Sequence, residues 1–242
     1  MEEFPETLTA EMLSGFVTTE RGCTHPKVGE IDGRRYIAKC GDWSMYSSDA
    51  HVLNELVADQ FLRTAGFNVP PSRRYGVDFG EGERVVRLAE YISAKPLMQV
   101  FGSADVTLRA KIRDQAIAAY PIQALIAGID TFTYDNVLVD ANGALWFVDN
   151  GASFDFRACG KRKGWFWGRQ DLADPQTGYF SLMQHPNQDV LQTIVGRISR
   201  SELVAAAKGF KFKELVATLP DVYRQLEFES YAVAMDECLI VR

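Results

Sequence analysis

The sequence predicts an α+β protein with two lobes, a small and mostly β lobe followed by a larger, mostly helical one. Short runs of β-branched and aromatic residues dominate the first hundred residues, with one stretch of helical spacing among them. The remainder has mostly helical character around a single apolar hairpin. A chain of 242 residues can bury the cores of two such lobes. We therefore expect an N-terminal lobe over residues 1–92 and a C-terminal lobe over residues 93–242.

The N-terminal lobe is predicted to contain five strands and one helix. Ser48 and Asp49 are typical of a helix N-cap, apolar residues then recur at helical spacing, and Gly66 ends the pattern. Asp32-Gly33 is a tight-turn signal between the second and third strands. The expected strands are residues 16–19, 28–31, 35–39, 74–77 and 85–92.

The C-terminal lobe is predicted to begin with a long helix from about residue 104 to residue 127. Pro121 is expected to kink it, because proline has no N–H for the helical hydrogen bond. An apolar hairpin follows over residues 128–151, with Asn142-Gly143 as its turn and Asp140 as a supporting turn residue. Residues 154–175 show no clear period and are expected to form a loop, and short helices follow, one starting near Ser201.

Bulk composition excludes several classes of protein. The formal net charge of −6 argues against a general nucleic-acid-binding protein. The sequence contains no run of about 18 apolar residues, so it predicts no transmembrane segment. The acidic N-terminus lacks the apolar core of a signal peptide, and four widely spaced cysteines do not form a disulfide framework. These features favour a cytoplasmic protein, with delivery into a host cell as an effector left open, and they indicate nothing about oligomeric state.

Polar residues gather at both ends of the predicted hairpin. Asp130 and Asn136 precede its first strand, and Asp149 follows its second. Phosphoryl transfer from a magnesium nucleotide needs a carboxylate that orients the attacking hydroxyl, and an amide and a carboxylate that hold the metal. Asp130 is the candidate for the first role, with Asp135 as the alternative, and Asn136 and Asp149 are candidate metal ligands. A plain surface turn would suit these residue types, but it does not explain acidic groups at both ends of one hairpin.

Lys39 ends the third predicted strand, and Glu55 lies on the apolar border of the helix that follows. An unpaired carboxylate at such a border is costly to bury, so we expect an ion pair between the two. A lysine held in this way can contact the α- and β-phosphates of a nucleotide. Taken alone, Lys39 could equally be a solvated lysine at a strand end.

Two further segments are candidates for nucleotide binding. Residues 20–27, around Gly22, join the first two strands and could cover a nucleotide with backbone amides, although a single glycine is not a glycine-rich loop. Backbone groups of Glu90 and Ile92, where the fifth strand ends, could bind an adenine edge. An ordinary hairpin loop and a plain strand end are the alternatives.

A basic and aromatic segment follows the hairpin. Its cations could hold an anionic substrate or an acidic membrane surface, or its tryptophans could simply fold the loop on itself. The segment comprises Arg157, Lys161, Arg162, Lys163 and Arg169, interleaved with Trp165, Phe166 and Trp167.

Lys39, Glu55, the loop of residues 130–136 and Asp149-Asn150-Gly151 together resemble the protein-kinase-like superfamily, in particular HipA-like bacterial kinases and type II phosphatidylinositol 4-kinases. The resemblance spans about residues 15 to 155. It implies a two-lobed kinase-like fold with ATP and Mg²⁺ as cofactors. The implied roles are phosphate binding for Lys39, pairing for Glu55, catalysis for Asp130, and magnesium binding for Asn136 and Asp149.

The chain departs from that family in three ways. Asp130 stands six residues before Asn136 rather than five, there is no His-Arg-Asp, and the nucleotide loop is poor in glycine. The resemblance therefore indicates a minimal and divergent member. Similarity to HipA-like and small bacterial effector kinases favours a Ser/Thr protein kinase acting on a protein rather than a lipid. A phosphoinositide or other small-molecule kinase is the alternative, and a nucleotide-binding pseudokinase that acts as a binding module is the second.

Overall fold

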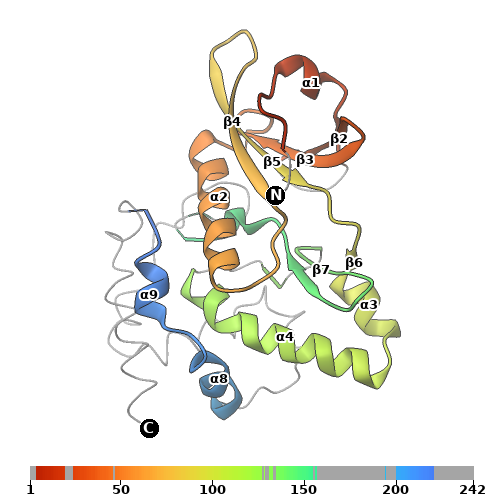
Figure 1. Cartoon of the computed structure of the whole chain (residues 1–242), viewed down its shortest axis with the longest axis vertical. Coiled ribbons are helices and arrows are strands. Elements are labelled where there is room, and N and C mark those ends of the chain that lie inside the picture. Colours follow the sequence, from red (N-terminus) through yellow and green to blue (C-terminus); the bar gives the residue numbers. More distant parts are fainter. Residues whose placement is uncertain are drawn as a thin grey trace.

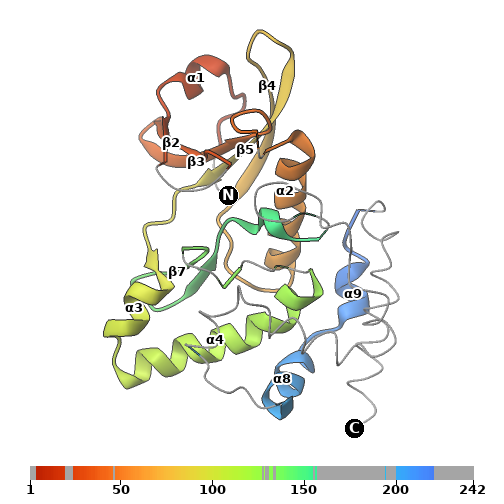
Figure 2. The ribbon, with the colours of Figure 1, turned by 180° about the vertical axis from the view of Figure 1, so that it is seen from behind.

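The structure, a computed structural model, places a β-sheet with helix α1 at one end of the molecule and the helices α3, α4 and α8 at the other (Figures 1 and 2). Helix α2 lies between them. The structure describes residues 4–19, 24–45, 47–126, 128, 131–132, 135–154, 156, 194 and 200–220. This is the α+β arrangement in two lobes that the sequence predicts.

The sheet end of the molecule contains the five predicted strands in an antiparallel sheet of order β1-β2-β3-β5-β4. Its elements are α1 (Ala10–Ser14), β1 (Val17–Thr18), β2 (Lys27–Ile31), β3 (Arg34–Cys40), α2 (Asp49–Thr64), β4 (Ser72–Asp78) and β5 (Glu83–Glu90). The side chain of Ser48 caps α2 by accepting from the N–H of His51. The predicted helix is α2, and the structure adds the short helix α1, which Thr9 caps.

The helical end is built around a second, three-stranded sheet of order β6-β7-β8. Its elements are β6 (Lys95–Pro96), α3 (Leu97–Ser103), α4 (Val106–Leu125), β7 (Val137–Val139), β8 (Leu145–Phe147), the 3₁₀ turn η1 (Asn150–Ala152), α8 (Arg200–Ala207) and α9 (Phe212–Val216). The expected helix from residue 104 starts later, because Ala104 is extended and Asp105 caps α4 through the N–H of Leu108. Helix α4 continues through Pro121. Among the described residues, no helix combines the length and apolarity needed to cross a bilayer.

The two faces of the five-stranded sheet have different partners. Successive side chains of a strand point to opposite faces. In β3, Tyr36 and Ala38 pack with Leu8 and Leu13 of the N-terminal segment. Lys39 points the other way, toward α2. The N-terminal segment therefore covers one face of the sheet and leaves the other to α2 and the pocket.

Helix α2 joins the two ends of the molecule. Ala58, Phe61 and Leu62 pack in the large apolar cluster that contains α4, β7 and β8. Glu55 and Asp59 of the same helix face the five-stranded sheet, where Glu55 contacts β3 and Asp59 contacts β5. Any charged contact between α2 and the sheet is thereby fixed relative to the hairpin that follows α4.

Candidate active site

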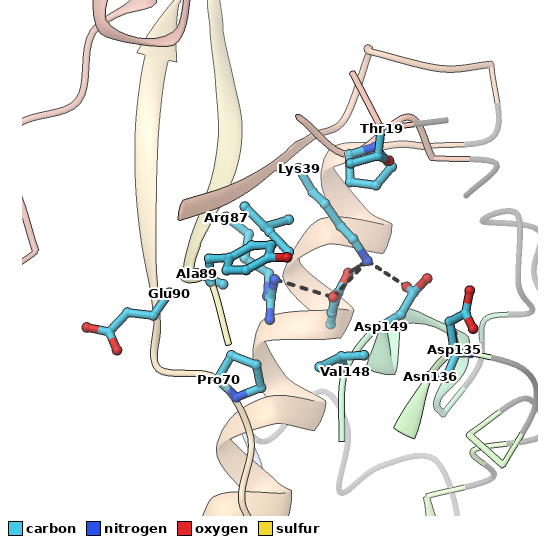
Figure 3. Close-up of a pocket in the computed structure, with 14 residues that line it drawn as sticks. Thr19, Lys39, Pro70, Arg87, Ala89, Glu90, Asp135, Asn136, Val148 and Asp149 are labelled. Carbon is cyan, nitrogen blue, oxygen red and sulfur yellow. Dashed lines mark hydrogen bonds and ion pairs between the residues drawn. The ribbon is translucent and has the colours of Figure 1, made fainter. Parts of the chain in front are cut away.

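A cavity of about 810 Å³ lies where the five-stranded sheet, α2 and the β7–β8 hairpin meet (Figure 3). It is larger than a water pocket and falls in the size range of ligand sites. Its lining residues are Thr19, Pro26, Ile37, Lys39, Glu55, Pro70, Arg87, Ala89, Glu90, Tyr91, Asp135, Asn136, Val148 and Asp149. Most of its charged groups are gathered around one wall.

Lys39 is the cation at the centre of that wall. Its Nζ donates to Glu55 Oε1 at 2.9 Å and Oε2 at 2.8 Å, and to Asp149 Oδ1 at 2.5 Å. The Lys39 side chain is 6% exposed. Burial acts to lower the pKa of Lys39, but the Asp149 and Glu55 carboxylates raise it above its ordinary value. The ammonium therefore stays charged at every physiological pH.

Asp149 lies two residues after the end of β8, and its backbone is left-handed, with φ 55° and ψ 50°. Aspartate tolerates this conformation better than most residues. Burial acts to raise the pKa of Asp149, but the Lys39 ammonium holds it below its usual range. The side chain is 41% exposed, in contrast to the 1% of Glu55. Asp149 thus offers an ionised carboxylate to the open part of the cavity, while Glu55 is reserved for pairing.

Asn136 is held beside this carboxylate by the hairpin. The N–H of Val148 donates to the carbonyl of Asn136 at 2.9 Å, and β7 pairs with β8 from Val137↔Phe147 onward. Asn136 and Asp149 both line the cavity. Oxygen donors of this kind suit Mg²⁺, which takes one or two carboxylates plus waters and substrate phosphates. The donor set therefore fits a magnesium nucleotide.

The remaining predicted site residues have varied positions. Asp135 lines the cavity. Glu90 also lines it, but its side chain points away from Lys39 and its N–H is taken by the carbonyl of Pro71 at 2.9 Å (Figure 3). Ile92 is not among the lining residues, and its carbonyl accepts from Ala94. Gly22, Asp130 and the basic aromatic segment from Arg157 to Arg169 lie outside the described residues.

Sequence reasoning missed a second layer of charge behind Lys39. Arg87 is the cross-strand neighbour of Lys39, and it lies 3.5 Å from Glu55 Oε1. Its guanidinium also contacts Asp59 Oδ2 at 2.6 Å. Arg87 is 3% exposed and Asp59 is fully buried. An arginine between Val86 and Leu88 in a buried strand was the available signal, because an arginine in such a place needs a partner.

No protein-family model matches the chain, and no curated protein matches it significantly. Solved structures that are similar in shape include WaaP in complex with acyl carrier protein (16% identity, TM-score 0.46, 89% of this chain and 90% of that chain). The apo form of a pseudokinase has 11% identity and a TM-score of 0.42, over 98% of this chain and 97% of that chain. The proinflammatory kinase CtkA of Helicobacter pylori has 9% identity and a TM-score of 0.43, over 98% of this chain and 100% of that chain. All three TM-scores lie below 0.5, so these likenesses carry no argument about the function of this chain.

Proposed function

We propose that the chain is a phosphotransferase that uses magnesium and ATP. One observation carries this proposal: a buried lysine bridges a helix carboxylate and a second, partly exposed carboxylate on the wall of a nucleotide-sized cavity. Lys39, Glu55 and Asp149 form this bridge within 2.9 Å. The same Lys–Glu and metal-carboxylate elements support phosphoryl transfer in kinases.

Each residue has a role in the proposed reaction. Lys39 would bind the α- and β-phosphates and Glu55 would keep it in place, while Asn136 and Asp149 would hold the metal. When bound, Mg²⁺ would neutralise the charge that develops on the β- and γ-phosphate oxygens. Asp130 would orient the acceptor hydroxyl and accept its proton, with Asp135 as the alternative. The protein then contributes positioning and charge stabilisation rather than covalent chemistry.

For the acceptor we propose a serine or threonine hydroxyl of a protein, on the motif resemblance to HipA-like kinases. The basic aromatic segment after the hairpin favours a second candidate, a phosphoinositide or another anionic small molecule. The departure of Asp130 from the family spacing favours a third, a pseudokinase that binds nucleotide without transferring phosphate.

One experiment separates these candidates. The protein is incubated with radiolabelled ATP and Mg²⁺, in parallel with cell lysate and with phosphoinositide vesicles, and label is followed in protein and in lipid. We expect protein labelling; lipid labelling would favour the second candidate, and ATP binding without labelling the third.

The matched variants for that experiment are Lys39→Ala and Lys211→Ala. Removing a preorganised cation from the phosphates is expected to lower turnover by at least about 100-fold. Lys211 is 76% exposed and, in the described part of the chain, pairs with the nearby Glu214, so its removal should leave turnover unchanged. Equal turnover in wild type and Lys39→Ala would exclude the lysine from the reaction.

A further inference from the structure

A single carboxylate on α2 joins three separate parts of the molecule. Asp59 Oδ2 accepts from Arg87 of β5, at 2.8 Å from Nε and 2.6 Å from Nη2, and from the hydroxyl of Ser72 in β4 at 3.1 Å. The other oxygen, Oδ1, accepts from Asn150 Nδ2 at 2.9 Å. Asn150 is the residue directly after Asp149. We call Asp59, Arg87 and Asn150 the polar joint.

The polar joint is not explained by stability alone. Burying an arginine and a carboxylate costs several kcal/mol of solvation per ion, and apolar residues of similar volume are often as stabilising. Burial acts to lower the pKa of Arg87, but Asp59 and Glu55 raise it, so the guanidinium stays charged. Because such an ion pair is weak evidence for stability, its hydrogen bonds to other elements point to a role in geometry.

The polar joint contacts the segment that carries Asp149. Asn150 Nδ2 also donates to the carbonyl of Phe147 at 3.3 Å, so it contacts the chain just before Asp149 as well. Asn54 of α2 donates to the carbonyls of Gly151 at 2.9 Å and Ser153 at 3.0 Å. The segment that carries Asp149 is thus attached to α2 by side-chain hydrogen bonds.

We propose that Asp59, with Arg87 and Asn150, is a positioning residue for Asp149. The joint fixes the left-handed turn from which the Asp149 carboxylate reaches Lys39 and, in the proposed function on which this inference rests, the metal. Partners behind metal ligands typically change metal affinity or activity by about 10- to 100-fold when mutated. The joint should therefore affect the use of magnesium far more than the binding of ATP itself.

The test compares three variants with wild type. Arg87→Met with Asp59→Leu replaces both buried charges with apolar side chains of similar volume. Asn150→Leu leaves the Arg87–Asp59 pair intact and removes only its link to the Asp149 segment. Asp42→Asn is the matched control, because Asp42 pairs with an arginine of the same strand, Arg84, but is 44% exposed.

Three quantities are measured on each protein: the thermal midpoint, the Kd for ATP in EDTA, and the Mg²⁺ concentration at half-maximal phosphate transfer. For Asn150→Leu we expect an ATP Kd in EDTA within about twofold of wild type. Arg87 lines the cavity and contacts Glu55, so the double variant is compared by its thermal midpoint and its requirement for Mg²⁺. For both we expect a requirement for Mg²⁺ raised by about 10- to 100-fold. The control should match wild type in all three. If the double variant does not fold, Asn150→Leu alone decides.

Two contrary outcomes are distinguishable. Folded variants with the Mg²⁺ requirement and turnover of an active wild type would overturn the positioning role and leave the proposed function intact. A wild-type protein that neither binds ATP nor transfers phosphate would overturn the proposed function, and the positioning role with it.

Discussion

The charge of Lys39 is set by its two carboxylate partners, Glu55 and Asp149. The proposed reaction also needs a carboxylate that accepts the proton of the acceptor hydroxyl. The sequence offers two aspartates for that role, Asp130 and Asp135. Asp135 lines the cavity, whereas Asp130 lies outside the described residues. The family resemblance favours Asp130, so the two must be separated by mutation.

Asp130→Asn is expected to lower kcat by about 100- to 10,000-fold with little change in the KM for ATP, because a proton acceptor acts on the transition state. Asp135→Asn should retain most of the turnover. Steady-state kinetics of the two purified variants check this. The reverse pattern would assign the catalytic role to Asp135. Full activity in both variants would show that neither aspartate acts as a general base.

Cys40 gives a prediction that is independent of catalysis. It is fully buried against the N-terminal segment, and burial raises its pKa from 9.0 to about 11. At pH 8 about one thiol in a thousand would then be ionised, and the thiolate is the reactive form. Iodoacetamide should leave Cys40 unmodified in the folded protein and label it in urea, as read by peptide mass mapping. Rapid labelling of the folded protein would contradict the burial.

The same shift has a defined effect on stability. The folded state holds the Cys40 proton more tightly than the unfolded chain does, so the protonated thiol contributes to the free energy of unfolding. This contribution is complete below pH 9 and is lost as pH rises toward about 11. Cys40→Ala should reduce this alkaline loss in urea titrations.

At the scale of elements, the contact between α2 and the turn η1 leaves no room for a side chain at Gly151. A Cβ at Gly151 would lie 2.6 Å from His51 Nε2 and 3.4 Å from Glu55 Oε2. His51 is itself buried, and burial lowers the pKa of His51, so the ring is neutral at pH 7. The glycine allows the segment after Asp149 to lie directly against α2.

Gly151→Ala is therefore expected to push this segment away from α2 and to lower phosphate transfer by at least about 10-fold. His51→Ala in the same chain should recover part of the loss, because it removes the atom that the new methyl group would strike. Gly102→Ala is the control: a Cβ there meets nothing within 4 Å, and alanine should stabilise α3 by up to about 1 kcal/mol. Turnover and thermal midpoints measure both effects, and wild-type turnover in Gly151→Ala would refute the close contact.

The elements whose signals are local could be predicted from the sequence. The hairpin is an example, because Asp140 accepts from the N–H groups of Asn142 and Ala144 and Gly143 has a φ of 75°, as turn chemistry requires. The short helix α1 was missed because five residues provide no measurable periodicity.

The polar joint could not be predicted for a different reason. Asp59 and Arg87 are 28 residues apart, and Asn150 lies 91 residues from Asp59. Nothing in the local sequence of any one of them indicates the other two. By contrast, Lys39 and Glu55 lie on consecutive elements, where a strand and the next helix often pack, so their pairing was a reasonable inference.

At the scale of the whole molecule, two separate apolar clusters stabilise the two ends. One lies between the N-terminal segment and the outer face of the five-stranded sheet, and the other surrounds α4, the hairpin and the second half of α2. The charged residues of the site lie between them. The Lys39 side of the site therefore depends on the first cluster, and the Asp149 side depends on the second.

This arrangement predicts that each cluster can be weakened separately. Replacing Leu13, which is 3% exposed, with alanine should lower the free energy of unfolding by about 2 to 5 kcal/mol, since it leaves a cavity under the sheet. Hydrogen exchange under native conditions should then accelerate in β2 and β3 and remain slow in α4. Ile112→Ala, at a fully buried position of α4, is the matched control and should produce the opposite pattern. If both variants accelerated exchange uniformly across the chain, the two ends would form one cooperative unit, and Lys39 and Asp149 would be brought together by a single core.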